Sequence, residues 1–195
     1  LFLLFPFILS YSQNLKLDSG LVASYPMNGK GTDISGHRKH GPVHTGKSTR
    51  DHNGKQRAAI RFVEGKGIFK RGLWAPVNIS PSNYPLLTIT AWIKTDKTYG
   101  HADLIANGEK ESCRGMVIDK DDGEYRWSVN CGGDGILHGP LVTTEWVFMA
   151  VLYDQANEGV CMIVNKQVYA SRGTMGKSVD VSAIGTYVGM RDDVR

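Results

Sequence analysis

The sequence lacks several features that would assign it to a familiar functional class. It has three cysteines but no Cys-x-x-Cys pair, and its six histidines lie in glycine-rich stretches without ligand spacing, so nothing resembles a zinc site. No serine has the Gly-x-Ser-x-Gly context of a hydrolase nucleophile. Lys and Arg number 23 against 19 Asp and Glu, a net charge of +4. This balance does not require a nucleic-acid partner.

Basic residues are denser in one stretch, from His37 to Arg61. Scattered charge of this kind is typical of a solvated loop. The alternative is a contact surface for an anionic glycan or an acidic lipid, which would bring these side chains onto one face. The sequence leaves both interpretations open.

Long hydrophobic runs are also scarce, with one exception at residues 1–10. This run is too short to span a bilayer. It has the length of a signal-peptide core, and Ser10 and Ser12 supply the small residues of a cleavage site before Gln13. We interpret residues 1–12 as part of a signal peptide, with a buried N-terminal strand or an uncleaved membrane anchor as the alternatives. The prediction is a secreted or cell-surface protein with no membrane insertion after cleavage.

No amphipathic helix is recognisable, whereas alternating strands are. Residues 87–94 place Leu87, Ile89, Ala91 and Ile93 on one face and threonines on the other. Further strands, separated by Gly, Asn, Asp and Ser clusters, are predicted at 21–25, 58–63, 67–70, 73–79, 116–118, 125–129, 146–153, 160–164 and 184–190. The pattern predicts one all-β domain over 13–195, a two-sheet antiparallel jelly-roll sandwich.

The cysteines permit one disulfide in an oxidising compartment. Two predicted strands flank the turn Asp121–Gly123. If Asp122 is the centre of a three-residue loop, Cys113 lies opposite Cys131 at close to bridging distance. We therefore predict a Cys113–Cys131 disulfide, with Cys161 either buried or paired between chains.

Several short segments also occur in a characteristic order. They are GLVASYPMNG (20–29), TDISG (32–36), AIRF (59–62), LTITAWIK (87–94), EWVFMAVLYD (145–154) and VCMIVN (160–165). Together they resemble laminin-G-like domains of the concanavalin A-like lectin and glucanase superfamily, over roughly residues 17–190. The resemblance implies the same sandwich. Members usually add a last strand beside the N-terminal one; here the sequence ends at Arg195, so we expect that strand to be either truncated or atypical.

The resemblance does not choose a function, because the superfamily includes lectins, adhesion modules, carbohydrate-binding modules and glucanases. Its retaining glucanases carry paired acids on one strand face. The nearest acids here, Asp119, Asp121, Asp122 and Glu124, fall on the predicted hairpin turn, which favours a solvated turn. We predict a non-catalytic module that binds carbohydrate or an extracellular glycoprotein. A spacer or adhesion domain of a larger secreted protein and a divergent glycoside hydrolase remain alternatives.

Site residues are predicted from exposed aromatics, because a ring face stacks on a sugar or anchors an interface. Tyr99, His101 and Trp127 are the candidates for ligand binding, whereas the core is expected to hold the remaining tryptophans, Trp74, Trp92 and Trp146.

Two further sites are suggested by short polar segments. Domains of the resembled type often hold calcium, and Asp33 and Ser35 offer oxygen ligands beside a glycine. The alternative is that Asp33 caps a turn of its own backbone. Asn78 begins the single N-glycosylation sequon, although Pro81 directly after it disfavours modification.

Overall fold

The computed structural model describes residues 20–62, 72–107, 114–131, 135–173 and 185–190. The predicted signal peptide and the strand predicted at 67–70 lie outside these ranges. Within them every regular element is a β-strand, as the sequence predicts. No helix in the described part of the chain is long and apolar enough to cross a membrane.

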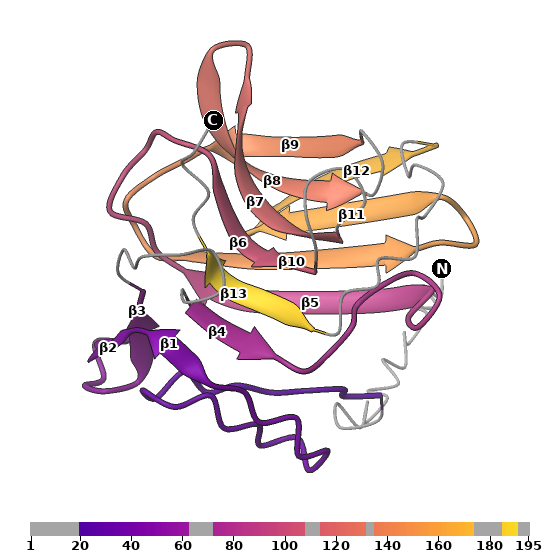
Figure 1. The fold of residues 1–195 in the computed structure, drawn as a ribbon. Helices are drawn as coiled ribbons and strands as arrows, with labels where there is room; N and C mark the ends of the chain where they lie inside the picture. The colour runs from indigo at the N-terminus through magenta and orange to yellow at the C-terminus, as the bar shows by residue number, and fades with distance from the viewer. Residues whose placement is uncertain (1–19, 63–71, 108–113, 132–134, 174–184, 191–195) are drawn as a thin grey trace, which may run out of the picture.

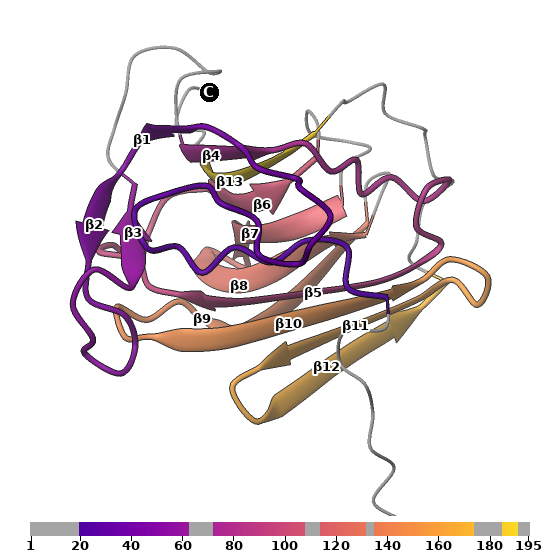
Figure 2. The same cartoon turned by 90° about the horizontal axis from the view of Figure 1, so that it is seen from below.

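The strands form two main sheets that lie face to face as layers (Figures 1 and 2). The seven-stranded sheet has the order β1 (Val43–Thr45), β4 (Gly72–Ala75), β13 (Thr186–Met190), β6 (Ala102–Ala106), β7 (Arg114–Asp121), β8 (Glu124–Cys131) and β9 (Ile136–Leu141). The four-stranded sheet has the order β12 (Gln167–Arg172), β11 (Gly159–Val164), β10 (Val147–Asp154) and β5 (Leu86–Ile93). A small pair, β2 (Lys47–Thr49) and β3 (Ala59–Arg61), lies at one edge of the sandwich.

The hydrophobic core fills the space between the two sheets. Met149 and Val151 of β10 are fully buried there, together with Met116 of β7 and Met162 of β11. The alternating residues of β5 pack against this core as predicted. Burying a side chain of this size contributes about 1.5–3 kcal/mol, so the alternating pattern of the strands accounts for the sandwich.

Two of the tryptophan predictions are wrong. Trp127, predicted to be exposed, is 1% exposed and belongs to the core, whereas Trp92, predicted to be in the core, is 46% exposed. The Trp92 ring stacks on His52 with 3.9 Å between centroids and 6° between planes. Alternation puts Trp92 on the opposite face of β5 from Leu87 and its inward neighbours, and the sandwich covers only the inward face.

The β7–β8 hairpin also differs from its prediction. Asp121 pairs with Glu124, so the loop holds only Asp122 and Gly123, with φ values of 48° and 89°. Two-residue hairpin loops favour positive φ at both positions, and Asp and Gly both tolerate it. The register therefore shifts by one residue, and Cys131 pairs with Arg114. Cys131 is a buried free thiol, while Cys113 lies outside the described residues.

The outward face of the four-stranded sheet is unusually apolar. Leu86 is 69% exposed, Leu152 41% and Val168 65%. Strand register puts Cys161 beside Leu152 and Ile163 beside Val168. We call these five residues the apolar face.

Candidate ligand-binding site

A network of charged side chains covers part of the outward face of the seven-stranded sheet. Alternation along β7 sends Met116 and Ile118 into the core and turns Asp119 and Asp121 to the other side. Because these two acids lie on the strand, the prediction that they belong to the turn is wrong. We call the following residues the polar network: His101, Asp103, Asp119, Asp121, Glu124 and Arg126.

His101 links the two strands at one end of the polar network. Its Nδ1 lies 3.1 Å from Asp119 Oδ1 on β7, and its Nε2 lies 3.7 Å from Asp103 Oδ1 on β6. The neighbouring Asp103 carboxylate, followed by that of Asp119, raises the pKa of His101 above its ordinary value, although burial acts in the opposite direction. The two carboxylates therefore favour the protonated form of His101 more than water does, and the ring links β6 to β7.

Arg126 organises the other end of the polar network. Its Nε lies 3.1 Å from Asp121 Oδ2, and its Nη2 lies 3.6 Å from Glu124 Oε2. Nη1 donates to the carbonyl of Gly139 at 3.1 Å. The register pairs Arg126 with Asp119, so the Arg126 and His101 clusters are continuous across β7 and β8.

Most charges of this network are partly buried. The side-chain exposures of Asp103, Asp119 and Arg126 are 16%, 22% and 27%, whereas that of Glu124 is 59%. Fully solvated ion pairs lose most of their strength to water, whereas partly buried pairs are screened less. The acids outnumber the bases, so the site presents several hydrogen-bond acceptors in fixed positions.

Of the three residues predicted to bind ligand, His101 belongs to the polar network. Tyr99 precedes His101 by two residues and is 64% exposed. Lys97 Nζ lies 5.8 Å from the centre of the Tyr99 ring. Trp127 does not belong to the polar network, since its side chain faces the core and helps line a different cavity, of about 400 Å³, beside Leu141.

The sequence interpretation missed Asp103 and Arg126. Asp103 follows His101 at a spacing of two, and Arg126 is the only base among the outward residues of β8. The signal that could have found them is a charged residue at alternate positions of strands whose other face is apolar.

The loop predicted to bind calcium is held together by its own hydrogen bonds. Asp33 is 4% exposed. Its Oδ1 accepts from the Ser24 and Ser35 amides, both at 2.9 Å. Its Oδ2 accepts from Ser35 Oγ at 2.8 Å and the Lys39 amide at 2.9 Å.

Burial alone would raise the pKa of the Asp33 carboxyl, but these hydrogen bonds outweigh it and hold the pKa well below its usual range. The geometry matches the alternative in which Asp33 caps the turn. Calcium binding at Asp33 and Ser35 stays a prediction. Across the described residues, no three His, Cys, Asp or Glu side chains are grouped to hold a metal ion.

Comparison with known proteins decides the family. The sequence profile of the concanavalin A-like lectin/glucanases superfamily matches residues 75–193. The chain belongs to this superfamily. The match confirms the resemblance noted from the sequence, and no curated protein matches the chain.

A solved structure supports the concanavalin A-like fold independently. It is domain 4 of AbnA, a GH43 extracellular arabinanase from Geobacillus stearothermophilus, in complex with arabinotriose. The two chains are 17% identical, and the likeness covers 88% of this chain and 84% of that one with a TM-score of 0.56. At this identity the likeness establishes the concanavalin A-like sandwich and leaves function to be argued from the site.

Proposed function

We propose that this domain binds carbohydrate through the polar network and the Tyr99 ring. The observation that carries the proposal is a set of paired, partly buried charges in which His101 follows the exposed Tyr99 by two residues. Carboxylates such as Asp103 and Asp119 accept hydrogen bonds from sugar hydroxyls, and Arg126 donates them. An exposed tyrosine ring provides the apolar surface on which a sugar face stacks.

The similar solved structure supports this proposal in one respect. That structure is a domain of an extracellular arabinanase in complex with arabinotriose, so a sandwich of similar fold binds an oligosaccharide. We propose that this chain likewise acts outside the cell, on a free glycan or the glycan of a glycoprotein.

We further propose that the domain does not hydrolyse its ligand. All four carboxylates of the polar network contact a base, Asp103 and Asp119 at His101 and Asp121 and Glu124 at Arg126. Glycoside hydrolysis needs one carboxyl to donate a proton and another to act as base or nucleophile, roles that these contacts oppose. Incubation with the bound glycan should release no reducing ends; steady release that is lost in Asp119→Asn would establish a hydrolase instead.

The experiment that tests binding is a glycan-array screen followed by titration calorimetry. Asp119→Asn removes one charge from the polar network and Tyr99→Ala removes the ring, so each should weaken binding about tenfold or more, given typical energies for such contacts. Tyr99→Phe, which keeps the ring, and Glu145→Gln, an exposed charge elsewhere, serve as matched controls. Equal losses in the controls and the site variants would reject this site.

The apolar face favours a second function, as an adhesion or spacer domain that packs on another protein. Leu86, Leu152 and Val168 expose large apolar side chains on one sheet face, and contiguous exposed apolar surface marks interaction sites. Leu152→Lys together with Val168→Lys should abolish self-association in sedimentation velocity if a second copy covers this face. A chain that sediments as a monomer before and after the change would rule out self-association through the apolar face.

A further inference from the structure

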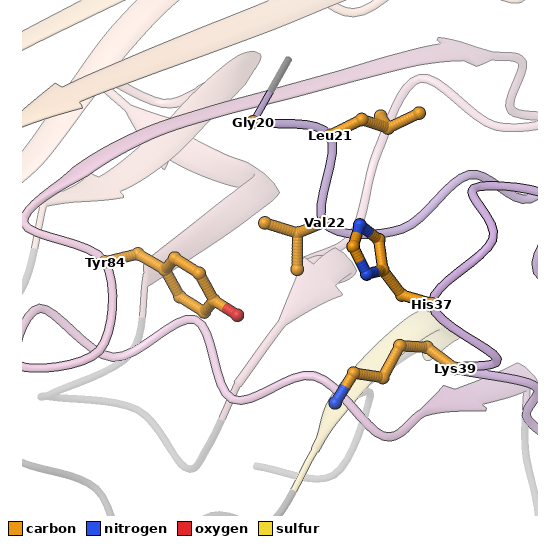
Figure 3. A pocket seen from close by; sticks show the side chains of 6 residues that line it. All are labelled: Gly20, Leu21, Val22, His37, Lys39 and Tyr84. Atoms are coloured by element: carbon orange, nitrogen blue, oxygen red, sulfur yellow. The ribbon is translucent and has the colours of Figure 1, made fainter. Parts of the chain in front are cut away.

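A second pocket lies away from the polar network, between the N-terminal segment and the connection from β4 to β5. It has a volume of about 390 Å³, within the range of about 300–1,000 Å³ typical of small-molecule sites. Figure 3 shows the residues that line it, which are Gly20, Leu21, Val22, His37, Lys39 and Tyr84. The Tyr84 hydroxyl points toward the space between the two loops, and the Lys39 side chain reaches toward it from the opposite wall.

One wall of this pocket is fixed by the Asp33 turn. The Lys39 amide donates to Asp33 Oδ2 at 2.9 Å, and the Tyr25 hydroxyl donates to the Lys39 carbonyl at 2.5 Å. The His37 amide donates to Ser35 Oγ at 3.3 Å. The backbone that presents His37 and Lys39 is therefore held before any ligand arrives, which lowers the entropic cost of binding.

The opposite wall is fixed through a buried arginine. The Tyr84 carbonyl accepts from Arg114 Nη1 at 2.6 Å, and Arg114 Nη2 donates to Gln155 Oε1 at 2.8 Å. Arg114 is 1% exposed. The Tyr84 amide also donates to the Ser80 carbonyl at 3.0 Å. Tyr84 thus faces the pocket from a backbone anchored to the core.

Among the described residues that line it, the pocket has a positive charge from Lys39 and no acid. Asp33 is the only acid between residues 31 and 40, and its oxygens are already taken up by hydrogen bonds inside the turn. Within the described part of the chain, the Lys39 ammonium has no carboxylate at ion-pair distance. His37 adds a ring nitrogen as a donor. An anion is the ligand that this arrangement favours.

The pocket also has an apolar side. The Val22 side chain lies between the Tyr84 ring and the His37 ring (Figure 3). A bare inorganic anion would leave these groups without a partner, whereas a sugar ring has apolar C–H faces that pack on aliphatic and aromatic side chains. The chemistry of the pocket therefore fits a charged group carried on a small ring.

We infer that this pocket binds the carboxylate of an acidic sugar, a uronate. Lys39 pairs with the carboxylate, His37 donates to it, and the Tyr84 hydroxyl bonds a ring hydroxyl while Val22 contacts the ring face. This site is separate from the polar network. It rests on the proposed carbohydrate-binding function and adds a second sugar-binding site, one that favours a negatively charged sugar.

The test is an NMR titration of amide shifts with three probes, D-glucuronate, D-glucose and D-glucose 6-sulfate. Glucuronate should give saturable shifts at His37, Lys39 and Tyr84, and added NaCl should weaken them because exposed charges are screened. Glucose should give none. Equal shifts with glucose would contradict the role of the anion, and stronger binding of the 6-sulfate would contradict the choice of a carboxylate.

Variants separate this site from a general charge effect. Lys39→Gln should weaken glucuronate binding roughly tenfold, the usual scale of one charge-assisted hydrogen bond, and Lys39→Arg should restore most of it. Lys47→Gln removes the same charge from an exposed position on β2 and should change nothing. An equal loss in Lys47→Gln would overturn the proposal. Glycan binding at the polar network should persist in Lys39→Gln, so failure at one site does not imply failure at the other.

Discussion

At the scale of single residues, His101 gives the polar network a pH dependence. Contacts with Asp103 and Asp119 raise its folded-state pKa above its ordinary value. The stabilisation is therefore fully present below pH about 6.5, the unfolded value, and is lost as the pH rises through the raised folded pKa. The side chain is 32% exposed, so solvent limits the size of the effect.

We expect His101→Gln to lower the melting temperature more at pH 5.5 than at pH 9. NMR titration of the His101 ring should give a pKa above that of a histidine in an unfolded reference peptide. An equal loss of stability at both pH values would show that the carboxylates do not hold the imidazolium.

Asp33 is the residue on which the N-terminal segment depends. Asp33→Asn removes the charge that accepts four hydrogen bonds and should destabilise the domain by about 1.5–3 kcal/mol in urea unfolding. The wild-type contribution is present above pH about 3.9, the unfolded value, and is lost as the pH falls toward the lowered folded pKa. Asp51→Asn is the matched control, since Asp51 accepts from two backbone amides at an exposed turn; an equal loss there would contradict the special role of Asp33.

Asp33 also provides the test of the calcium site predicted at Asp33 and Ser35. A bound ion would have to replace hydrogen bonds that Asp33 already accepts, so we expect thermal unfolding to be unchanged between calcium and EDTA. Binding to the folded state alone would raise the melting temperature with ion concentration, and such a rise, abolished by Asp33→Asn, would establish the calcium site.

At the scale of elements, the β7–β8 loop is one residue shorter than predicted, which changes the residue that lies opposite Cys131. A disulfide closing a loop of the length from Cys113 to Cys131 would contribute about 3 kcal/mol. Because Cys131 pairs with Arg114, we expect Cys113→Ser to leave the urea midpoint unchanged under oxidising conditions. If Cys113→Ser instead lowers the free energy of unfolding by about 3 kcal/mol, the Cys113–Cys131 disulfide and the three-residue loop are correct.

Cys131 provides an independent check of the same register. Burial raises the pKa of its thiol to about 11, so little reactive thiolate forms at neutral pH. Iodoacetamide should modify Cys131 only after unfolding. Rapid labelling in the folded protein would contradict the buried placement, and absence of labelling after unfolding without reductant would indicate a disulfide.

The sequence predicts elements well where alternation is strong and poorly elsewhere. β5 and β10 are confirmed within one residue of the predicted bounds, because their inward faces are continuous apolar rows. β9 is missed because Gly139 and Pro140 interrupt its pattern. A proline is tolerated there since β9 is the edge strand of its sheet. The segment predicted as a strand at 21–25 has an irregular backbone instead.

At the scale of the whole molecule, the sequence pattern predicts the sandwich but not which face of each strand is covered. Alternation alone does not say which face of β5 a second layer covers, which is why Trp92 and Trp127 exchange roles. His101 reaches the polar network directly before β6, close to its predicted place, whereas Arg126 joins it only through sheet pairing. Contacts between distant strands are therefore the part of the site that a single sequence does not reveal.

The two proposed sites have opposite charge. The polar network carries more acids than bases, whereas Lys39 in the pocket has no carboxylate partner among the residues that the structure describes. A domain with this division would bind a glycan that contains both neutral and acidic sugars through two contacts on one chain, which raises overall affinity when both engage.

Carbohydrate binding at the polar network is tested most directly by mapping the amide shifts of the folded domain with the glycan that binds best on the array. We expect saturable shifts concentrated at Tyr99, His101 and Asp103 and on β7 and β8 near Asp119 and Arg126, and their loss in Asp119→Asn with the remaining spectrum unchanged. Shifts concentrated instead around the apolar face, or undiminished in Asp119→Asn, would contradict binding at this site.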